Sequence, residues 1–266
     1  METTGKKVLN VTAISIFSKL LTMVGVVLYQ SQFGIFSHEL NAFNYAQTLQ
    51  SSIFTILGTT LTTIIVPVYS SFLARGEAER GKKYIDNILT LAMLFVILLT
   101  AILQLLAPWI ISTTDFTPNR WDFSIFALRL LTPVMIFFTL RDVITGFLQS
   151  HGKFNMAAAV SIPSALITIF YSFFLSEKFG VQGLVIATLI GYSLQALILL
   201  PSAARTGYRY KFSPGLGNPD VLASLKLVPS VLLGVSAYQI NQLYNNNLST
   251  HGNRPGNFHK ALLSSG

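Results

Sequence analysis

The sequence contains no cysteine, which excludes disulfide bonds and cysteine-ligated metals from the fold. It is also poor in charge. Asp, Glu, Lys and Arg make up 11% of its 266 residues, whereas a soluble domain has about 25%. Hydrophobic residues account for 52% of the chain. A protein surface in contact with water usually carries more charged residues than this, so the composition predicts a membrane protein.

Three long stretches contain no charged residue at all, namely residues 88–112, 154–176 and 180–204. Each exceeds the ~20 apolar residues that a membrane-spanning helix needs. None of them shows the strict alternation of a transmembrane β-strand. The pattern therefore predicts an all-α fold, a polytopic membrane helix bundle.

Glycine and proline mark the breaks between the predicted helices. Pro67, Pro133, Pro163 and Pro201 lie inside or at the edge of helices, where proline produces kinks. We expect helices near residues 8–32, 41–72, 84–112, 123–150, 154–177, 180–205 and 221–248.

The two ends of the sequence differ in character. The first predicted helix lacks a small-residue cleavage site, and we interpret it as a retained span and not as a signal peptide. Residues 251–266 are polar and rich in Gly, Ser and Asn, which is typical of disorder. An odd number of helices before such a tail predicts a chain that stops early.

The basic residues indicate an orientation. With the N-terminus in the cytoplasm, the inside segments hold 11 Lys and Arg, and the outside loops between helices hold only Arg120 and Lys178. Such an excess marks the cytoplasmic side. Arg254 and Lys260 in the tail would lie outside and weaken the bias slightly. Topology thus explains the net charge of +8, and we expect no nucleic-acid partner.

Polar residues recur at three- and four-residue steps in the first two predicted helices, so they share one face of each helix. A polar face in hydrocarbon must look at other helices or at water. Two interpretations stay open, namely close helix packing through hydroxyl residues and the wall of a water-filled cavity. A lysine in the stripe favours the cavity. The stripes contain Ser15, Ser18, Lys19, Thr22, Gly25 and Tyr29, and then Asn41, Asn44, Thr48, Ser51, Ser52, Thr55, Thr59 and Thr62.

Lys19 has an unusual position for a charge. It lies about 11 residues into its helix, or ~16 Å deep, near the middle of a ~30 Å hydrocarbon core. A charge there costs at least ~2.5 kcal/mol, and neither of the first two predicted helices contains an acidic partner. An anionic ligand would supply that partner. A lysine that snorkels or is hydrogen-bonded is the structural alternative.

The fourth predicted helix holds three further charges, Arg129, Arg141 and Asp142. Arg129 is near the outer end, where its side chain can snorkel. Arg141 and Asp142 are adjacent, so we expect them to point in different directions, each toward a partner on another helix. For both, we expect structural pairing in preference to ligand contact.

Several strings resemble the MurJ/MviN family of lipid II flippases. "SKLLTMVG", "SQFG" and "NAFNYAQTLQSSIFTILGTTLTTIIVPVYS" are similar to the family's first two helices, and "LRLLTPVMIFFTLRDVITGFLQSHGKF" is similar to its fourth. "LPSAARTGYRYKF" and "PSVLLGVSAYQINQLYNN" resemble the end of the sixth and the start of the seventh. The likeness covers about residues 8–249, and its motifs also fit the wider superfamily of multidrug, oligosaccharidyl-lipid and polysaccharide exporters.

The resemblance implies a fold and a function. The family has two lobes of six helices around a cationic cavity that opens alternately to either side. Here it implies an N-terminal six-helix lobe at 1–212, the loop and first helix of an incomplete second lobe at 213–249, and a disordered polar tail at 250–266. The implied activity is export of an undecaprenyl-diphosphate-linked peptidoglycan precursor across the bacterial inner (plasma) membrane, with no bond made or broken.

The implied partners follow from that activity. They are a lipid-linked oligosaccharide, membrane lipid, and either a missing C-terminal lobe or a second copy of the chain. Lys19 matches the basic residue of the family's Ser-Arg/Lys pair. The chain departs from the family at Gly25, where a second arginine is usual, at "SSIFT", where basic residues are common, and at Asn41, which replaces an acidic residue. The cavity candidates are Lys19, Ser18, Thr22, Asn41, Asn44, Gln47, Ser51 and Arg141.

Other functions are weighed against this one. A polysaccharide-repeat or drug exporter of the same superfamily is one alternative. An antiporter usually needs a membrane-embedded carboxylate, and the first, second, third, fifth and sixth predicted helices contain no acidic residue in their apolar runs. An inactive truncated membrane scaffold is another. No His, Asp or Glu cluster has metal-ligand spacing, so we expect no enzyme, no catalytic residues, no metal and no cofactor.

Overall fold

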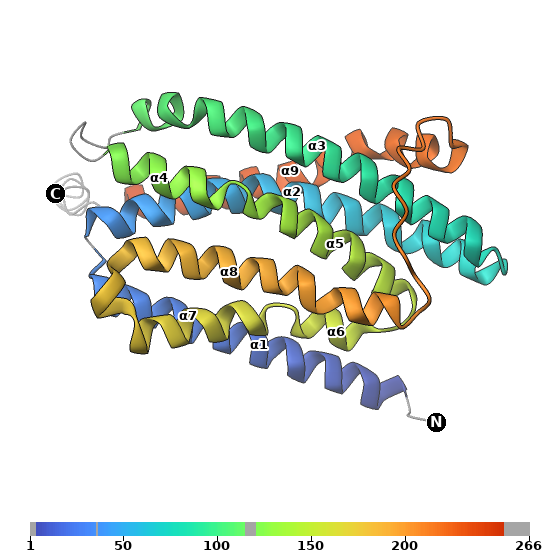
Figure 1. The fold of residues 1–266 in the computed structure, drawn as a ribbon, viewed down its shortest axis with the longest axis horizontal. Coiled ribbons are helices and arrows are strands. Elements are labelled where there is room, and N and C mark those ends of the chain that lie inside the picture. Colours follow the sequence, from blue (N-terminus) through green and yellow to red (C-terminus); the bar gives the residue numbers. More distant parts are fainter. Residues whose placement is uncertain (1–3, 36, 115–120, 253–266) are drawn as a thin grey trace, which may run out of the picture.

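The structure is a computed structural model that describes residues 4–35, 37–114 and 121–252. Helices are the only regular elements among these residues, which confirms the all-α fold (Figure 1). The elements in chain order are α1 (Thr4–Phe33), α2 (His38–Ala74), α3 (Ala78–Ser112), α4 (Trp121–Leu131), α5 (Val134–Ser150), α6 (Phe154–Ala159), α7 (Ile162–Phe174), α8 (Ser176–Ala204) and α9 (Pro219–Gly252).

Two predicted helices are each divided in two, which corrects the prediction of continuous segments. The fourth breaks before Pro133, which caps α5, because proline lacks the N–H of the helical ladder. The fifth breaks into α6 and α7, and Pro163 lies in the first turn of α7, where proline is tolerated. Pro67 and Pro201 lie inside α2 and α8, and neither helix breaks at its proline, although α8 has a kink at Gly180, where φ is 56°.

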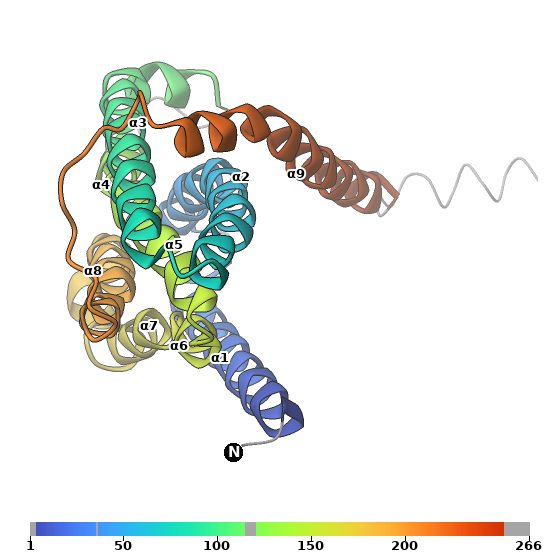
Figure 2. The same cartoon turned by 90° about the vertical axis from the view of Figure 1, so that its right-hand side faces the viewer.

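Among the described residues, six helical segments are long and apolar enough to cross a membrane. They are α1, α2, α3, α4 with α5, α6 with α7, and α8. The seventh predicted helix forms as α9. Figure 2 shows α9 crossing α2 and α3 and then leaving the bundle. Residues 253–266 of the predicted tail lie outside the described residues.

The basic residues gather at one end of the bundle. The start of α1, the α2–α3 turn, the α5–α6 turn and the end of α8 all lie at that end (Figure 1). These segments carry Lys6 and Lys7, Arg75 and Arg80, Lys153, and Arg205. The positive-inside rule assigns this end to the cytoplasm, with the N-terminus.

Two large apolar cores, one toward each end, and a smaller third cluster hold the bundle together. The core near the α1–α2 turn contains Leu40, Phe43 and Leu131, all at most 1% exposed. The core near the basic end contains Tyr84 and Phe147, both fully buried. Between these two cores, α2, α5 and α8 carry polar side chains. The apolar packing therefore fixes three helices around a polar middle.

The connection from α8 to α9 is held against α3 by buried polar groups. The Tyr208 hydroxyl donates to Asp86 Oδ1 at 2.8 Å, and the Lys211 backbone N–H donates to the same oxygen at 3.2 Å. One turn further, Thr90 Oγ1 accepts from the Ser213 N–H and bonds the Tyr210 hydroxyl. Burial and the Asp86 bond raise the pKa of Tyr208, so its phenol remains a donor at neutral pH.

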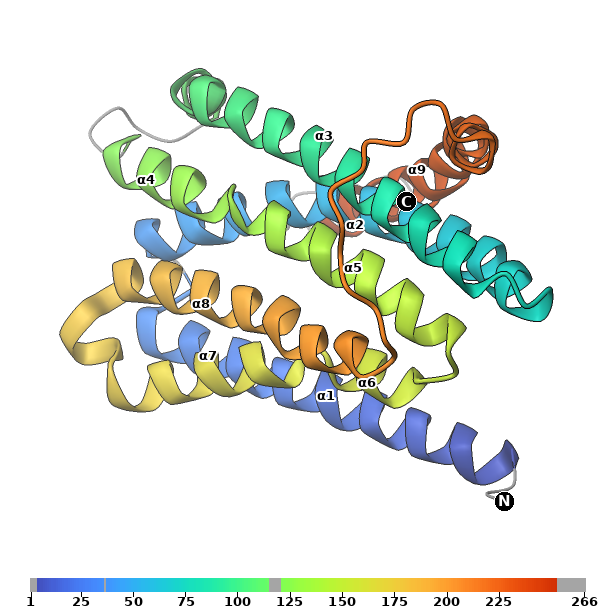
Figure 3. The same ribbon diagram turned by 45° about the vertical axis from the view of Figure 1, so that its right-hand side comes forward.

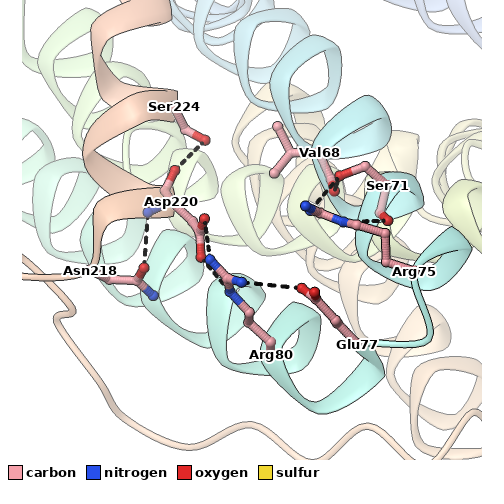
Figure 4. A network of polar contacts seen from close by, with 8 residues as sticks. All are labelled: Val68, Ser71, Arg75, Glu77, Arg80, Asn218, Asp220 and Ser224. Carbon is pink, nitrogen blue, oxygen red and sulfur yellow. Dashed lines mark hydrogen bonds and ion pairs between the residues drawn. The ribbon is translucent and has the colours of Figure 1, made fainter.

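The start of α9 is joined to α3 by an ion pair with two parallel bonds (Figure 4). Arg80 Nε and Nη2 donate to the two oxygens of Asp220, each at 2.9 Å. Asn218 accepts from the Asp220 N–H, and Ser224 donates to the Asp220 carbonyl. These bonds place the first turn of α9 beside the cytoplasmic end of α3. Figure 3 shows the connection running from α8 across to that position.

We expect Tyr208→Phe to lower the free energy of unfolding by about 1–2 kcal/mol, because a buried Asp86 oxygen loses a donor. Thermal unfolding of the purified chain in detergent measures the loss. Tyr210→Phe is the matched control, since Tyr210 is 46% exposed and its partner Thr90 keeps other bonds. Equal stability of Tyr208→Phe and the parent chain would contradict the prediction.

Candidate functional site

A polar cavity of about 390 Å³ lies midway along the bundle. Five helices line it, α1, α2, α5, α7 and α8. Side chains with hydroxyl, amide or charged groups outnumber the purely apolar ones, which is unusual inside a membrane bundle. The lining residues are Thr22, Val26, Tyr29, Phe43, Gln47, Ser51, Phe54, Thr55, Thr59, Phe138, Arg141, Asp142, Ser161, Ser164, Ala165, Thr168, Thr188, Tyr192 and Gln195.

The cavity opens along an exposed face of α2. Ser51, Thr55 and Thr59 line it and are exposed. Ser51 and Thr55 donate to backbone carbonyls of their own helix, at 3.1 and 2.7 Å. A hydroxyl satisfied in this way can face apolar surroundings and still turn toward a polar guest. These hydroxyl groups of α2 can therefore face either apolar surroundings or a polar ligand.

An ion pair lies in the wall of the cavity. Arg141 Nε donates to Asp142 Oδ1 at 2.8 Å, and the two side chains are 18% and 14% exposed. This corrects the expectation that these neighbours point in different directions, whereas the expected partner on another helix is found for Arg141 in Gln195 of α8. Adjacent helix positions are separated by about 100°, but the long arginine side chain folds back across that angle. The pair brings equal and opposite charge into the cavity.

Three further contacts hold Arg141 in place. Its Nη1 donates to Gln195 Oε1 of α8 at 2.7 Å. Its guanidinium lies over the rings of Phe138 and Phe54, 4.5 and 5.2 Å from their centroids. Such cation–π contacts strengthen when water is excluded. Gln195 is itself fixed by donating Nε2 to Ser164 Oγ at 2.5 Å. The arginine is therefore preorganised by α2, α5 and α8 together.

Gly58 lets the carboxylate approach α2. A Cβ atom at this position would overlap Asp142 Oδ2 and would lie 3.1 Å from Asp142 Cγ. Only glycine leaves room for the carboxylate between α2 and α5 at this level. Asp142 therefore lies between the surface of α2 and the guanidinium of Arg141.

The structure brings together half of the predicted cavity residues. Thr22, Gln47, Ser51 and Arg141 line the cavity. Gln47 donates Nε2 to the Tyr192 hydroxyl at 3.1 Å, which joins α2 to α8. The other four predicted residues lie outside the lining.

Ser18 is buried and donates to the Ala158 carbonyl at 2.9 Å, so it joins α1 to α6. Lys19 is exposed on α1, one turn nearer the basic end than Thr22 and on the same helix face as Thr22 and Val26. Lys19 thus lies between the cavity level and the cytoplasmic end.

Asn41 is exposed near the start of α2, and Asn44 is half-buried one turn before Gln47. Both are on the far side of the cavity from Lys19 along the helix axis. Gly25, where the family resemblance implies an arginine, faces Thr168 of α7, whose Cγ2 would lie 3.4 Å from an added Cβ. Close packing of α1 on α7 accounts for the small residue at that position.

Sequence reasoning missed the contributions of α7 and α8. Ser161, Ser164 and Thr168 line the cavity from α7, and Thr188, Tyr192 and Gln195 line it from α8. Both sets follow steps of three and four residues. This is the same signal that identified the stripes of the first two predicted helices. It was present in the fifth and sixth as well.

Comparison with known proteins gives a consistent family. A family model described as "Lipid II flippase MurJ" matches residues 31–257. A probable lipid II flippase MurJ of Buchnera aphidicola is 25% identical over 251 residues, which are 90% of this chain and 48% of that protein. A probable lipid II flippase MurJ of Vibrio cholerae is 23% identical over 192 residues, 67% of this chain and 37% of that protein. The chain spans about half the length of these curated relatives or less.

Solved structures share the fold. A lipid II flippase MurJ in an inward closed conformation matches with a TM-score of 0.69 and 19% identity, over 87% of this chain and 48% of that one. The Vibrio cholerae MATE transporter VcmN in its bent form matches with a TM-score of 0.76 and 14% identity, over 98% of this chain and 60% of that one. Identities this low support a common fold and no shared substrate.

Proposed function

This chain belongs to the MurJ family of lipid II flippases, and from that premise we propose that it moves an undecaprenyl-diphosphate-linked sugar from the inner to the outer leaflet by alternating access. It is a multi-pass protein of the bacterial inner membrane. The observation that carries the proposal is a hydroxyl-lined cavity with a preorganised guanidinium in the middle of the bundle.

The physical task is the passage of a charged headgroup through hydrocarbon. Moving an ion or an unsatisfied polar group out of water is costly, and a polar cavity reduces that cost by replacing the lost hydrogen bonds. The Arg141 guanidinium supplies donors for the diphosphate, and the hydroxyls of α2 and α7 supply donors for the sugar. The prenyl tail stays in lipid. No covalent step is needed.

The cavity takes only part of the headgroup. Its volume of about 390 Å³ is at the small end of the usual ~300–1,000 Å³ range for ligand sites. We assign the diphosphate to it and place the remaining sugar and peptide outside, along the exposed face of α2. Asn41, Thr48, Ser52 and Thr63 are exposed on α2. Such residues suit a water-filled space better than acyl chains.

A second lobe facing α2 would complete that space. The chain spans about half of its curated relatives, and we assign residues 1–212 to the N-terminal lobe and residues 213–249 to the start of the next. The facing lobe is either a C-terminal lobe or a second copy of this chain. Transport by purified chain alone in proteoliposomes would support the second copy.

Lys19→Ala tests the headgroup's path to the cavity. We expect the exposure of lipid II at the cell surface to fall about three- to tenfold when the variant replaces the parent chain in cells depleted of their own flippase, because one phosphate contact is worth about 1 kcal/mol. Lys6→Ala is the matched control, since Lys6 also lies on α1 but at its first turn. Unchanged exposure with Lys19→Ala would remove Lys19 from the path.

A drug or cation exporter is the second candidate, and one observation favours it. Asp142 places a carboxylate in the cavity, and membrane-embedded carboxylates are the groups that exchange protons or cations in antiporters. The two functions differ in cargo. Proteoliposomes that accumulate a cationic dye but leave lipid II in its original leaflet would favour the exporter. Movement of lipid II without the dye would favour the flippase.

A further inference from the structure

We propose that Asp142 is a built-in counter-ion of Arg141 that opposes the binding of the substrate's diphosphate and so sets how tightly the cavity holds an anion. The inference rests on the proposed function, because it takes a diphosphate as the ligand. It assigns to Asp142, which contacts Nε of the guanidinium, a role in the specificity for the anion and in the release of the anion.

The first argument is the number of donors that Arg141 keeps. A guanidinium has five N–H groups. Nε is used by Asp142, and one N–H of Nη1 is used by Gln195. Among the described residues no further partner is found for the other three. They are one N–H of Nη1 and both N–H groups of Nη2, and these can donate to the oxygens of a phosphate. The arginine can therefore contact Asp142 and an anion together.

The second argument is that Asp142 has one polar partner. Its Oδ1 accepts from Arg141, and its Oδ2 faces Gly58, which has no side chain to donate. Within the described part of the chain, no second donor holds this carboxylate. A carboxylate fixed for structural reasons alone usually has several donors. A carboxylate with a single donor is affected directly when that donor binds a ligand.

The third argument is electrostatic. Arg141 and Asp142 are the only charged residues among those that line the cavity, so the lining carries no net charge. A phosphate bound at the guanidinium would lie close to the carboxylate, and like charges at such distances repel strongly where water is scarce. Asp142 therefore weakens anion binding. A carrier benefits, since a site that binds its cargo too tightly releases it slowly on the far side.

The consequence is discrimination by charge. A singly charged anion gains little at a guanidinium that already has a counter-ion. A diphosphate brings two phosphate groups and can satisfy the remaining N–H groups of Arg141 and the hydroxyls of the cavity wall at once. The neutral pair thus favours a lipid diphosphate over small inorganic anions.

The test measures binding of undecaprenyl diphosphate, and separately of inorganic phosphate, to the purified chain in detergent by calorimetry. We expect Asp142→Asn to bind both anions about tenfold more tightly or better, because a nearby negative charge is removed while an oxygen remains for Arg141 Nε. The preference for the diphosphate should shrink. Asp220→Asn makes the same chemical change at the exposed Arg80 pair and should leave both affinities unchanged.

The two proposals fail in different ways. If Asp142→Asn binds no more tightly than the parent chain, while Arg141→Gln loses binding, then the counter-ion role is wrong and the proposed function stands. If neither variant changes binding, the cavity is not the diphosphate site. If Asp142→Asn does not fold, Asp142→Ser keeps a small hydroxyl acceptor, and the same comparison is made with it.

Discussion

Replacing Arg141 with glutamine is expected to lower lipid II exposure at the cell surface about 100-fold. Arg141 is the only Lys or Arg among the residues that line the cavity. Two charge-assisted hydrogen bonds to a phosphate, each worth about 1.5–3 kcal/mol, are lost with it, and about 3 kcal/mol corresponds to 100-fold. The amide of glutamine can still donate to Asp142, which limits the structural damage. The measurement is lipid II exposure in cells depleted of their own flippase.

The control for this prediction is another arginine on the same predicted helix. Arg129 of α4 is exposed and lies toward the end of the bundle away from the basic loops. Arg129→Gln should leave lipid II exposure near that of the parent chain. Arg141→Lys separates charge from geometry, because lysine keeps the charge but cannot form two parallel bonds. Full exposure with Arg141→Gln would show that the cavity does not receive the diphosphate.

The helices could be predicted from the sequence because hydrocarbon restricts the backbone so strongly. A lipid-exposed segment must satisfy its own hydrogen bonds, so uncharged runs such as residues 88–112 leave little choice but a helix. The breaks were harder to locate. Pro133 and Pro163 both interrupt a predicted helix, whereas Pro67 and Pro201 do not. That difference depends on packing around each proline, which a single sequence does not reveal.

The candidate site was predictable where it follows from helical periodicity. Helix geometry fixes which residues share a face, and Thr22, Gln47 and Ser51 of the predicted cavity residues line the cavity. Ser18, Asn41 and Asn44 follow the same spacing and lie outside the lining, because periodicity does not fix the level of the cavity along the helix.

The pairing of Arg141 with Asp142 was not predictable in that way. It depends on a flexible side chain and on the room that Gly58 leaves from another helix. The pattern of residues within a single helix does not reveal tertiary contacts of this kind.

Gly58→Ala is expected to disturb both stability and transport, because the new methyl group occupies space that Asp142 now fills. The added Cβ would overlap Asp142 Oδ2 and lie 3.2 Å from Phe54 Cζ, so the carboxylate and the ring must both move. Overpacking of a well-fitted interior costs about 1–3 kcal/mol. The displaced carboxylate no longer meets Arg141 at its present geometry. We expect a lower unfolding temperature in detergent and lipid II exposure reduced severalfold.

A second glycine substitution separates this effect from a general cost of adding a methyl group. At Gly25 of α1 the added Cβ would meet Thr168 Cγ2 at 3.4 Å, an ordinary van der Waals distance, so Gly25→Ala should leave stability unchanged or slightly higher. Alanine also has a higher helix propensity than glycine by about 1 kcal/mol, which favours both variants equally. A difference between them therefore measures the steric conflict at Asp142. Equal stability and equal transport would mean that α2 and α5 separate easily, and that Gly58 does not fix the position of the carboxylate.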